Sequence, residues 1–286
     1  MQRNQYLLIG GALLLVVALY FLGDTKGKKG NKTTNQVAQS SSEHQHDPMN
    51  PSEAIEAIDI VKYTQTNTSK LSPDLKSKIE SLTLKAEKEN TAVAYKDVAE
   101  FWEKQNELNC AAQYYKKAAF LENTEKSVTF AGNLLMAILQ KTEDPSVRKW
   151  QALEAIECFS KALELNPNNV DTKIALATCY TEGTGETMKG VTLLREVTAQ
   201  DSTNISANII LGKMAIQSGQ LDKAIKRLEL VLSLRPENTE AMYFLAEAYK
   251  GQGNKEKAIQ LFEQCKKLVK NPDFSKEIDN YIKTFK

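Results

Sequence analysis

The sequence has little proline and glycine, almost no histidine and almost no net charge. Its 286 residues include only 7 prolines and 13 glycines, which favours long helices over turn-rich β structure. The 37 basic and 36 acidic side chains leave no overall field that would attract nucleic acid. The only histidines, His44 and His46, lie in a polar stretch, so a folded domain further on has no histidine to activate a nucleophile. These absences argue against a nucleic-acid-binding protein and against a hydrolase of the Ser–His or Cys–His type.

The sequence also contains no motif for binding a cofactor, a metal ion or a small-molecule substrate. Residues 182–190 are rich in glycine, but they lack the Gly-Lys-Ser/Thr ending of a phosphate-binding loop and follow a predicted helix instead of a strand. We interpret this segment as a loose turn between two helices. The acidic residues show no metal-ligand spacing. We therefore expect no enzyme activity, no cofactor and no small-molecule substrate.

The four cysteines lie far apart and form no CxxC or other metal-ligand pattern; they are Cys110, Cys158, Cys179 and Cys265. Unpaired cysteine is among the most frequently buried residue types, so we expect these side chains to fill small spaces in a core. A disulfide between two facing cysteines is the alternative if the domain lies in an oxidising compartment.

The first part of the chain contains an apolar run. Residues 6–22 carry no charge, and all of them except Gly10 and Gly11 are apolar. With Gly23 the run gives a helix about 27 Å long, which nearly spans a hydrocarbon core about 30 Å thick. We predict a single transmembrane helix over residues 6–23 in contact with the lipid bilayer, preceded by a tail, residues 1–5. A cleaved signal peptide is the alternative, but its apolar region is usually shorter and no small-x-small pair follows the run before Asp24.

The charges on either side of this run indicate an orientation. Arg3 alone precedes it, whereas four lysines follow it within ten residues: Lys26, Lys28, Lys29 and Lys32. The excess of lysine on the second side slightly favours a cytoplasmic location for the rest of the chain. A single N-terminal span followed by a large domain is also a common arrangement for export, so the exported side remains the alternative.

Residues 24–51 are polar and rich in Ser, Gln, Asn and Lys. Such a stretch cannot bury enough apolar surface to fold, and we predict a flexible linker with a root-mean-square reach of about 30 Å.

Small residues recur at nearly constant intervals in the second half of the chain. Ala155, Gly190, Ala224 and Ala258 are 35, 34 and 34 residues apart. A period of 34 residues indicates a helix-turn-helix unit that repeats along the chain, because one such unit cannot bury its apolar face alone.

Further residues within each period identify the kind of repeat. Leu211 and Gly212 fall in the first helix of one unit, Ala224 and Leu228 fall in the second, and Pro236 marks the exit. This pattern resembles the tetratricopeptide repeat over residues 92–272. The resemblance implies an all-α fold, a right-handed superhelical solenoid. Its five repeats would be residues 92–125, 126–169, 170–204, 205–238 and 239–272.

Two of these repeats depart from the period. Residues 126–169 contain about ten extra residues near 142–150, and residues 170–204 are one residue too long. Amphipathic helices predicted over 52–62 and 72–88 do not match the repeat, and we assign residues 52–91 to an N-terminal helical cap. Residues 273–286 predict a C-terminal capping helix whose apolar face shields the last repeat.

The resemblance also implies where a partner would bind, because the first helices of such repeats line the inner wall of the solenoid. The family's Lys, Asn and Arg clamp for a terminal carboxylate is absent: Lys96, Glu100, Asp171 and Ala175 stand at the positions compared. Apolar and aromatic residues occupy other groove-facing positions and predict a surface for a hydrophobic or helical segment of a partner protein. One member of each adjacent pair can instead pack between repeats, and the two lysines can be ordinary solvated residues. The predicted protein-binding residues are Phe130, Ile174, Ile209, Ile210, Lys213, Tyr243, Phe244 and Lys250.

Together these features predict a membrane-tethered scaffold that holds a partner protein and takes part in the assembly or regulation of a membrane-associated complex. Two alternatives remain: a chaperone-like factor that binds unfolded proteins on the exported side, and a non-catalytic subunit of a membrane enzyme complex. The sequence does not identify the partner.

Overall fold

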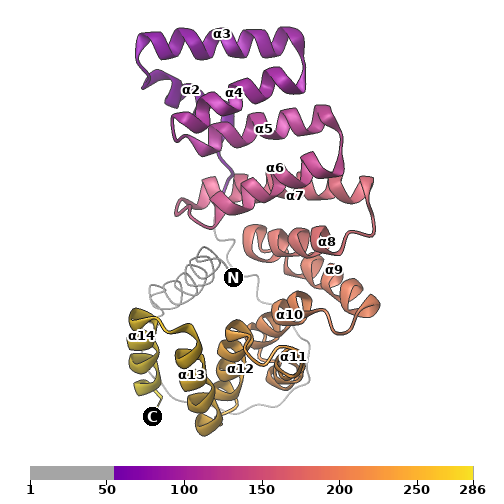
Figure 1. The fold of residues 1–286 in the computed structure, drawn as a ribbon, viewed down its shortest axis with the longest axis vertical. Helices are drawn as coiled ribbons and strands as arrows, with labels where there is room; N and C mark the ends of the chain where they lie inside the picture. Colours follow the sequence, from indigo (N-terminus) through magenta and orange to yellow (C-terminus); the bar gives the residue numbers. More distant parts are fainter. Residues whose placement is uncertain (1–54, 286) are drawn as a thin grey trace, which may run out of the picture. The chain divides into compact units, whose positions relative to one another are not determined.

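The computed structural model describes residues 55–285, and every regular element among them is a helix (Figure 1). These residues divide into two compact units, one within Ala54–Pro236 and one within Glu237–Lys286. The predicted transmembrane helix, 6–23, and the predicted linker, 24–51, lie outside the described residues. Within residues 55–285, no helix has both the length and the apolar character that crossing a bilayer requires.

Helices α4 to α13 form five consecutive helix pairs, four in the first unit and one in the second. The pairs follow the segments that the sequence marks as repeats, except that α6 begins at Glu125, one residue before its segment. The pairs are α4 (Ala92–Lys104) with α5 (Leu108–Glu122), α6 (Glu125–Leu139) with α7 (Pro145–Leu165), α8 (Val170–Thr178) with α9 (Thr187–Gln200), α10 (Ile205–Gln217) with α11 (Leu221–Leu234), and α12 (Thr239–Gly251) with α13 (Lys255–Val269).

The first helix of every pair begins at a capping side chain. The five capping residues accept a hydrogen bond from a backbone N–H three residues later, which satisfies a donor that the helix itself leaves open. They are Thr91, Thr124, Asn169, Asn204 and Asn238. The local sequence therefore fixes the start of each repeat before any packing is considered.

Within a pair, a residue without a side chain on the first helix faces a large residue on the second. A Cβ atom added to Gly132 of α6 would lie 2.8 Å from the Phe159 ring of α7, and one added to Gly212 would lie 2.9 Å from Leu228 Cγ. Phe159 and Leu228 are fully buried. In these two pairs, a small residue that faces a large one is thus the contact that lets the helices approach.

The one-residue excess in the third repeat is absorbed as a π-helix. Residues Cys179–Thr184 (η1) continue directly from α8 with the wider π turn, which is how a single inserted residue fits into a helix. Gly183 packs on the Cβ of Ala152, and Gly190 packs on the backbone oxygen of Ala177. The interpretation of residues 182–190 as a loose turn is wrong except at Gly185 and Glu186, because helical structure runs to Thr184 and α9 begins at Thr187.

The ten extra residues of the second repeat lengthen α7, which has 21 residues. Arg148 donates from Nη1 to the backbone oxygens of Leu139, at 2.7 Å, and Thr142, at 3.0 Å. The buried Gln151 donates from Nε2 to Asn109 Oδ1, at 2.7 Å. Arg148 therefore satisfies backbone oxygens at and just after the end of α6, and Gln151 links α7 to α5 by a hydrogen bond.

The N-terminal cap differs from its prediction. The helix expected over residues 52–62 is instead α2 (Ile60–Ser69), because the Asp59 side chain accepts hydrogen bonds from the N–H groups of Val61 and Lys62 and so acts as the N-cap. Residues 55–59 form no helix, and Ile58 N–H donates to Ser146 O at 3.3 Å. The second helix, α3 (Pro73–Glu89), begins after the N-cap Ser72, as its sequence predicts.

In the second unit, α14 (Pro272–Lys283) packs against α13. The predicted apolar face is buried at Ile278, Tyr281 and Ile282. The centre of this unit is Phe262 of α13, whose ring centroid lies 5.7 Å from that of Tyr281. A terminal helix thus covers the apolar side of the last helix pair.

All four cysteines are buried, as their residue type predicts, and all four are free thiols. Burial raises the pKa of Cys110 to about 11 and the pKa of Cys158, Cys179 and Cys265 to about 12. These thiols stay protonated near neutral pH and behave as small apolar side chains.

Candidate functional site

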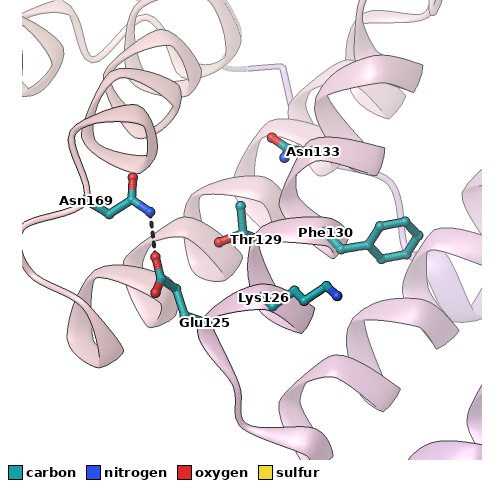
Figure 2. Close-up of a pocket in the computed structure, with 6 residues that line it drawn as sticks. All are labelled: Glu125, Lys126, Thr129, Phe130, Asn133 and Asn169. Carbon is teal, nitrogen blue, oxygen red and sulfur yellow. Dashed lines mark hydrogen bonds between the residues drawn. The ribbon is translucent and has the colours of Figure 1, made fainter.

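An open pocket of about 440 Å³ lies on α6, the first helix of the second repeat, next to the start of α8 (Figure 2). Five of its lining residues belong to α6, and Asn169 caps α8. The lining residues are Glu125, Lys126, Thr129, Phe130, Asn133 and Asn169.

The sequence of α6 separates this lining from the core. Val128, Ala131, Gly132 and Leu135 form the buried face that packs on α7. Lys126, Thr129, Phe130 and Asn133 recur at three- and four-residue spacing on another face, so the helical period brings them together.

One side of the pocket is occupied by an amide–carboxylate cluster. Glu125 accepts hydrogen bonds from Asn166 Nδ2, at 3.0 Å, and from Asn169 Nδ2 (Figure 2). These amides lower the pKa of the Glu125 carboxyl, which is therefore ionised near neutral pH. The adjacent Thr129 hydroxyl is buried and has no hydrogen-bond partner among residues 55–285. A ligand or a water molecule in the pocket would satisfy this hydroxyl.

The other side of the pocket is apolar and positively charged. The Phe130 side chain is 56% exposed, and its ring makes an edge contact with Tyr115 of α5 at a centroid distance of 5.8 Å. Lys126 is exposed, and it forms no ion pair with any residue that the structure describes. In Figure 2 the Lys126 side chain extends toward the same side as the Phe130 ring, away from the Glu125 carboxylate.

Only Phe130 of the predicted binding residues lies in this pocket. In the same unit, Ile174 and Ile210 are half-buried against a core cluster with Leu194. Ile209 is only 5% exposed, so its predicted exposure is wrong. Lys213 Nζ lies 2.5 Å from Glu182 Oε1 of η1, which makes it one end of an ion pair. The π-helix places Glu182 beside Lys213. The repeat pattern in the sequence does not predict this π-helix, so it does not predict the ion pair.

The predicted aromatic stripe in the second unit is also wrong as an exposed surface. Tyr243 is 6% and Phe244 is 7% exposed, because the rings pack together and Tyr243 also contacts Phe262 at a centroid distance of 5.5 Å. Lys250 hydrogen-bonds the Tyr281 hydroxyl, which in turn donates to Glu247 Oε2 at 2.9 Å. Burial raises the pKa of the Glu247 carboxyl. These residues therefore connect α12 to α14.

Sequence reasoning missed the polar members of the pocket. The prediction searched for apolar residues at groove-facing positions, so it passed over Lys126, Thr129 and Asn133 although they share the face of Phe130. The three- and four-residue spacing around Phe130 was the signal that would have found them. Glu125 and Asn169 come from successive repeats, and only packing brings them together.

Residues 55–285 contain no candidate metal site, because no group of three or more His, Cys, Asp or Glu side chains among them is placed to hold an ion.

Comparison with known families identifies the repeats. Models described as tetratricopeptide repeat match residues 215–274 and residues 151–169. Residues 151–169 and 215–274 are therefore similar to tetratricopeptide repeats. The matched residues include the small residues Ala155, Ala224 and Ala258, whose spacing predicted this family. No curated protein matches the chain in sequence.

Solved structures show the same fold. A tetratricopeptide repeat protein from Parabacteroides merdae aligns with a TM-score of 0.51 at 16% identity over 68% of this chain and 74% of its own. MamA from Desulfovibrio magneticus RS-1 aligns at 0.49 with 19% identity, over 64% and 97% of the two chains. YrrB, whose structure is described as a protein with an unusual peptide-binding site, aligns at 0.45 with 22% identity, over 71% and 99%. At these identities the alignment with the first of them supports an all-α repeat fold and nothing more specific.

Proposed function

We propose that this protein is a membrane-tethered scaffold that binds a partner protein through the inner helix layer of its repeats, with the α6 pocket as the main contact. The observation that carries the proposal is the exposed Phe130 ring beside unused hydrogen-bonding groups of Thr129 and Asn133. Aromatic anchors surrounded by polar groups are typical of protein–protein contacts. Catalysis has no support among the described residues, because the pocket holds no nucleophile paired with a base.

The outer side of the first two repeats is a poorer binding surface, because α2 already covers part of it. Gln113 of α5 donates from Nε2 to Thr64 Oγ1 at 2.5 Å, and Asn109 donates from Nδ2 to Tyr63 Oη at 3.4 Å. The chain's own N-terminal helix therefore occupies the α5 side, whereas the α6 pocket is open.

A double substitution in the pocket tests the proposed contact. Phe130→Ser with Asn133→Ala removes the aromatic anchor and an exposed amide, and neither side chain belongs to the core. We expect recovery of a crosslinked partner from native membranes to fall by about 30-fold, the effect of losing about 2 kcal/mol at a binding anchor. The measurement is quantitative recovery of each crosslinked protein relative to the unsubstituted chain.

The matched control is Leu153→Ser on α7, which removes an apolar side chain of similar exposure, 41%, from the second helix of the same repeat. This variant should recover partners normally. Equal recovery by the pocket variant and the unsubstituted chain would contradict the proposed contact.

The tether is the second part of the proposal, and it is supported by the uncharged run over residues 6–22. Removal of residues 2–23 should release the protein into the supernatant, whereas the full chain should stay in the pellet after alkaline extraction of membranes. Release of the full chain would contradict an integral anchor. The lysines after the run favour a repeat domain on the cytoplasmic side.

A further inference from the structure

The spacing of Lys126 and Phe130 suits a ligand with two neighbouring groups of different chemistry. The two residues are four apart on α6, so their Cβ atoms are about 6 Å apart on one helix face. Both side chains extend in the same direction in Figure 2. A carboxylate and an apolar side chain on alternate residues of an extended segment match this spacing, because residues two apart point to the same face and lie about 7 Å apart.

The charges around the pocket favour an acidic ligand. Lys126 is the only cation that lines the pocket. The pocket's carboxylate, Glu125, accepts hydrogen bonds from the amides of Asn166 and Asn169, and Figure 2 shows it directed toward Asn169 and away from the lysine side chain. Lys126 is therefore the charged group that remains for a ligand.

The acidic residues of the neighbouring helix α4 do not reverse this preference. Asp97 lies 3.5 Å from Lys85 Nζ, and Glu100 lies 3.9 Å from Lys104 Nζ. Glu103 accepts a hydrogen bond from the Tyr115 hydroxyl at 2.7 Å. Asp97 therefore has a partner on α3, and Glu100 and Glu103 have partners within their own repeat.

We propose that the α6 pocket recognises an extended protein segment in which an acidic residue and an aromatic or aliphatic residue are separated by one residue. The carboxylate pairs with Lys126, the apolar side chain packs on Phe130, and the main chain hydrogen-bonds to Thr129 and Asn133. From Lys126 to Asn133 the helix rises about 10 Å, which is the length of about three extended residues. This inference rests on the proposed function and adds the chemistry of the partner.

Fluorescence anisotropy with three labelled peptides tests this chemistry on the full chain in lipid nanodiscs. All three are ten residues long in a Gly/Ser background, and their central residues are Asp-Gly-Phe, Lys-Gly-Phe and Asp-Gly-Ser; they are called the Asp-Phe, Lys-Phe and Asp-Ser peptides. We expect the Asp-Phe peptide to bind about fivefold more tightly than the Lys-Phe peptide, because a partly exposed ion pair replaces a repulsion. We expect it to bind about tenfold more tightly than the Asp-Ser peptide, which lacks the apolar group.

Charge reversal at Lys126 distinguishes specific recognition of an acidic residue from nonspecific peptide binding. Lys126→Glu should reverse the order, so that the Lys-Phe peptide binds more tightly than the Asp-Phe peptide. Lys226→Glu, the same change at an exposed lysine of α11, should leave the order unchanged. An order that Lys126→Glu does not alter would overturn the inference.

The outcomes also distinguish this inference from the proposed function. If the Asp-Phe and Lys-Phe peptides bind equally while the Phe130 and Asn133 double variant loses its partner, the acidic preference is wrong and the scaffold proposal stands. If no peptide binds and the double variant recovers partners normally, both are wrong.

Discussion

Phe159→Ala should lower the free energy of unfolding by about 3–5 kcal/mol, the range for removing a buried phenylalanine ring. The ring is fully buried between α6 and α7, and Gly132 has no side chain that could move into the space it leaves. Urea unfolding followed by tryptophan fluorescence measures the loss directly. Both tryptophans, Trp102 and Trp150, are buried in the same unit as Phe159 and therefore report on it.

Phe130→Ala is the matched control for this prediction, because it removes the same side chain from a position that is 56% exposed on the facing helix. Its effect should stay below about 1 kcal/mol. Equal losses for the two variants would mean that the small–large contact between Gly132 and Phe159 does not hold the repeat together.

Phe262→Ala should have an effect of similar size, about 3–5 kcal/mol, in the second unit. Its fully buried ring lies against Tyr243, Tyr281 and Phe285 at centroid distances of 5.5, 5.7 and 6.3 Å. Aromatic pairs of this kind contribute about 0.5–1.5 kcal/mol each beyond the area they bury. Since residues 237–286 contain no tryptophan, amide hydrogen exchange measured by mass spectrometry is the suitable method. Peptides from α12, α13 and α14 should exchange much faster in the variant.

Leu268→Ala on the same helix provides the comparison, because Leu268 is partly exposed. Exchange in α12 to α14 should change little in that variant. Unchanged protection in Phe262→Ala would show that the ring is not the centre of this unit.

The repeats were predictable because their period and their packing residues have the same physical cause. Gly132 and Phe159 had to be a small and a large residue for α6 and α7 to approach, and that requirement recurs with Gly212 and Leu228. The starts of the helices were less predictable where capping competes with periodicity. The apolar pattern before Lys62 suggested a helix from residue 52, but Asp59 caps the helix that begins at Ile60.

The candidate site was only partly predictable. Phe130 was found by its apolar character at a groove-facing position, and it is exposed. Tyr243 and Phe244 met the same criterion and are buried, because aromatic neighbours such as Phe262 pack against Tyr243. A groove-facing position in a repeat specifies the direction in which a side chain points. It does not specify which neighbouring side chains cover that side chain.

The sequence by itself determined that this protein is built from repeated helix pairs, because small and large residues at a fixed period are a property of the chain alone. It also determined where the first helix of each repeat starts, through local caps such as Thr124 and Asn169. Only the tertiary structure decided which side chains of the inner layer reach solvent and that Glu125 meets the amides of the next repeat. Burial depends on neighbours from other helices, and a helical period carries no information about those neighbours.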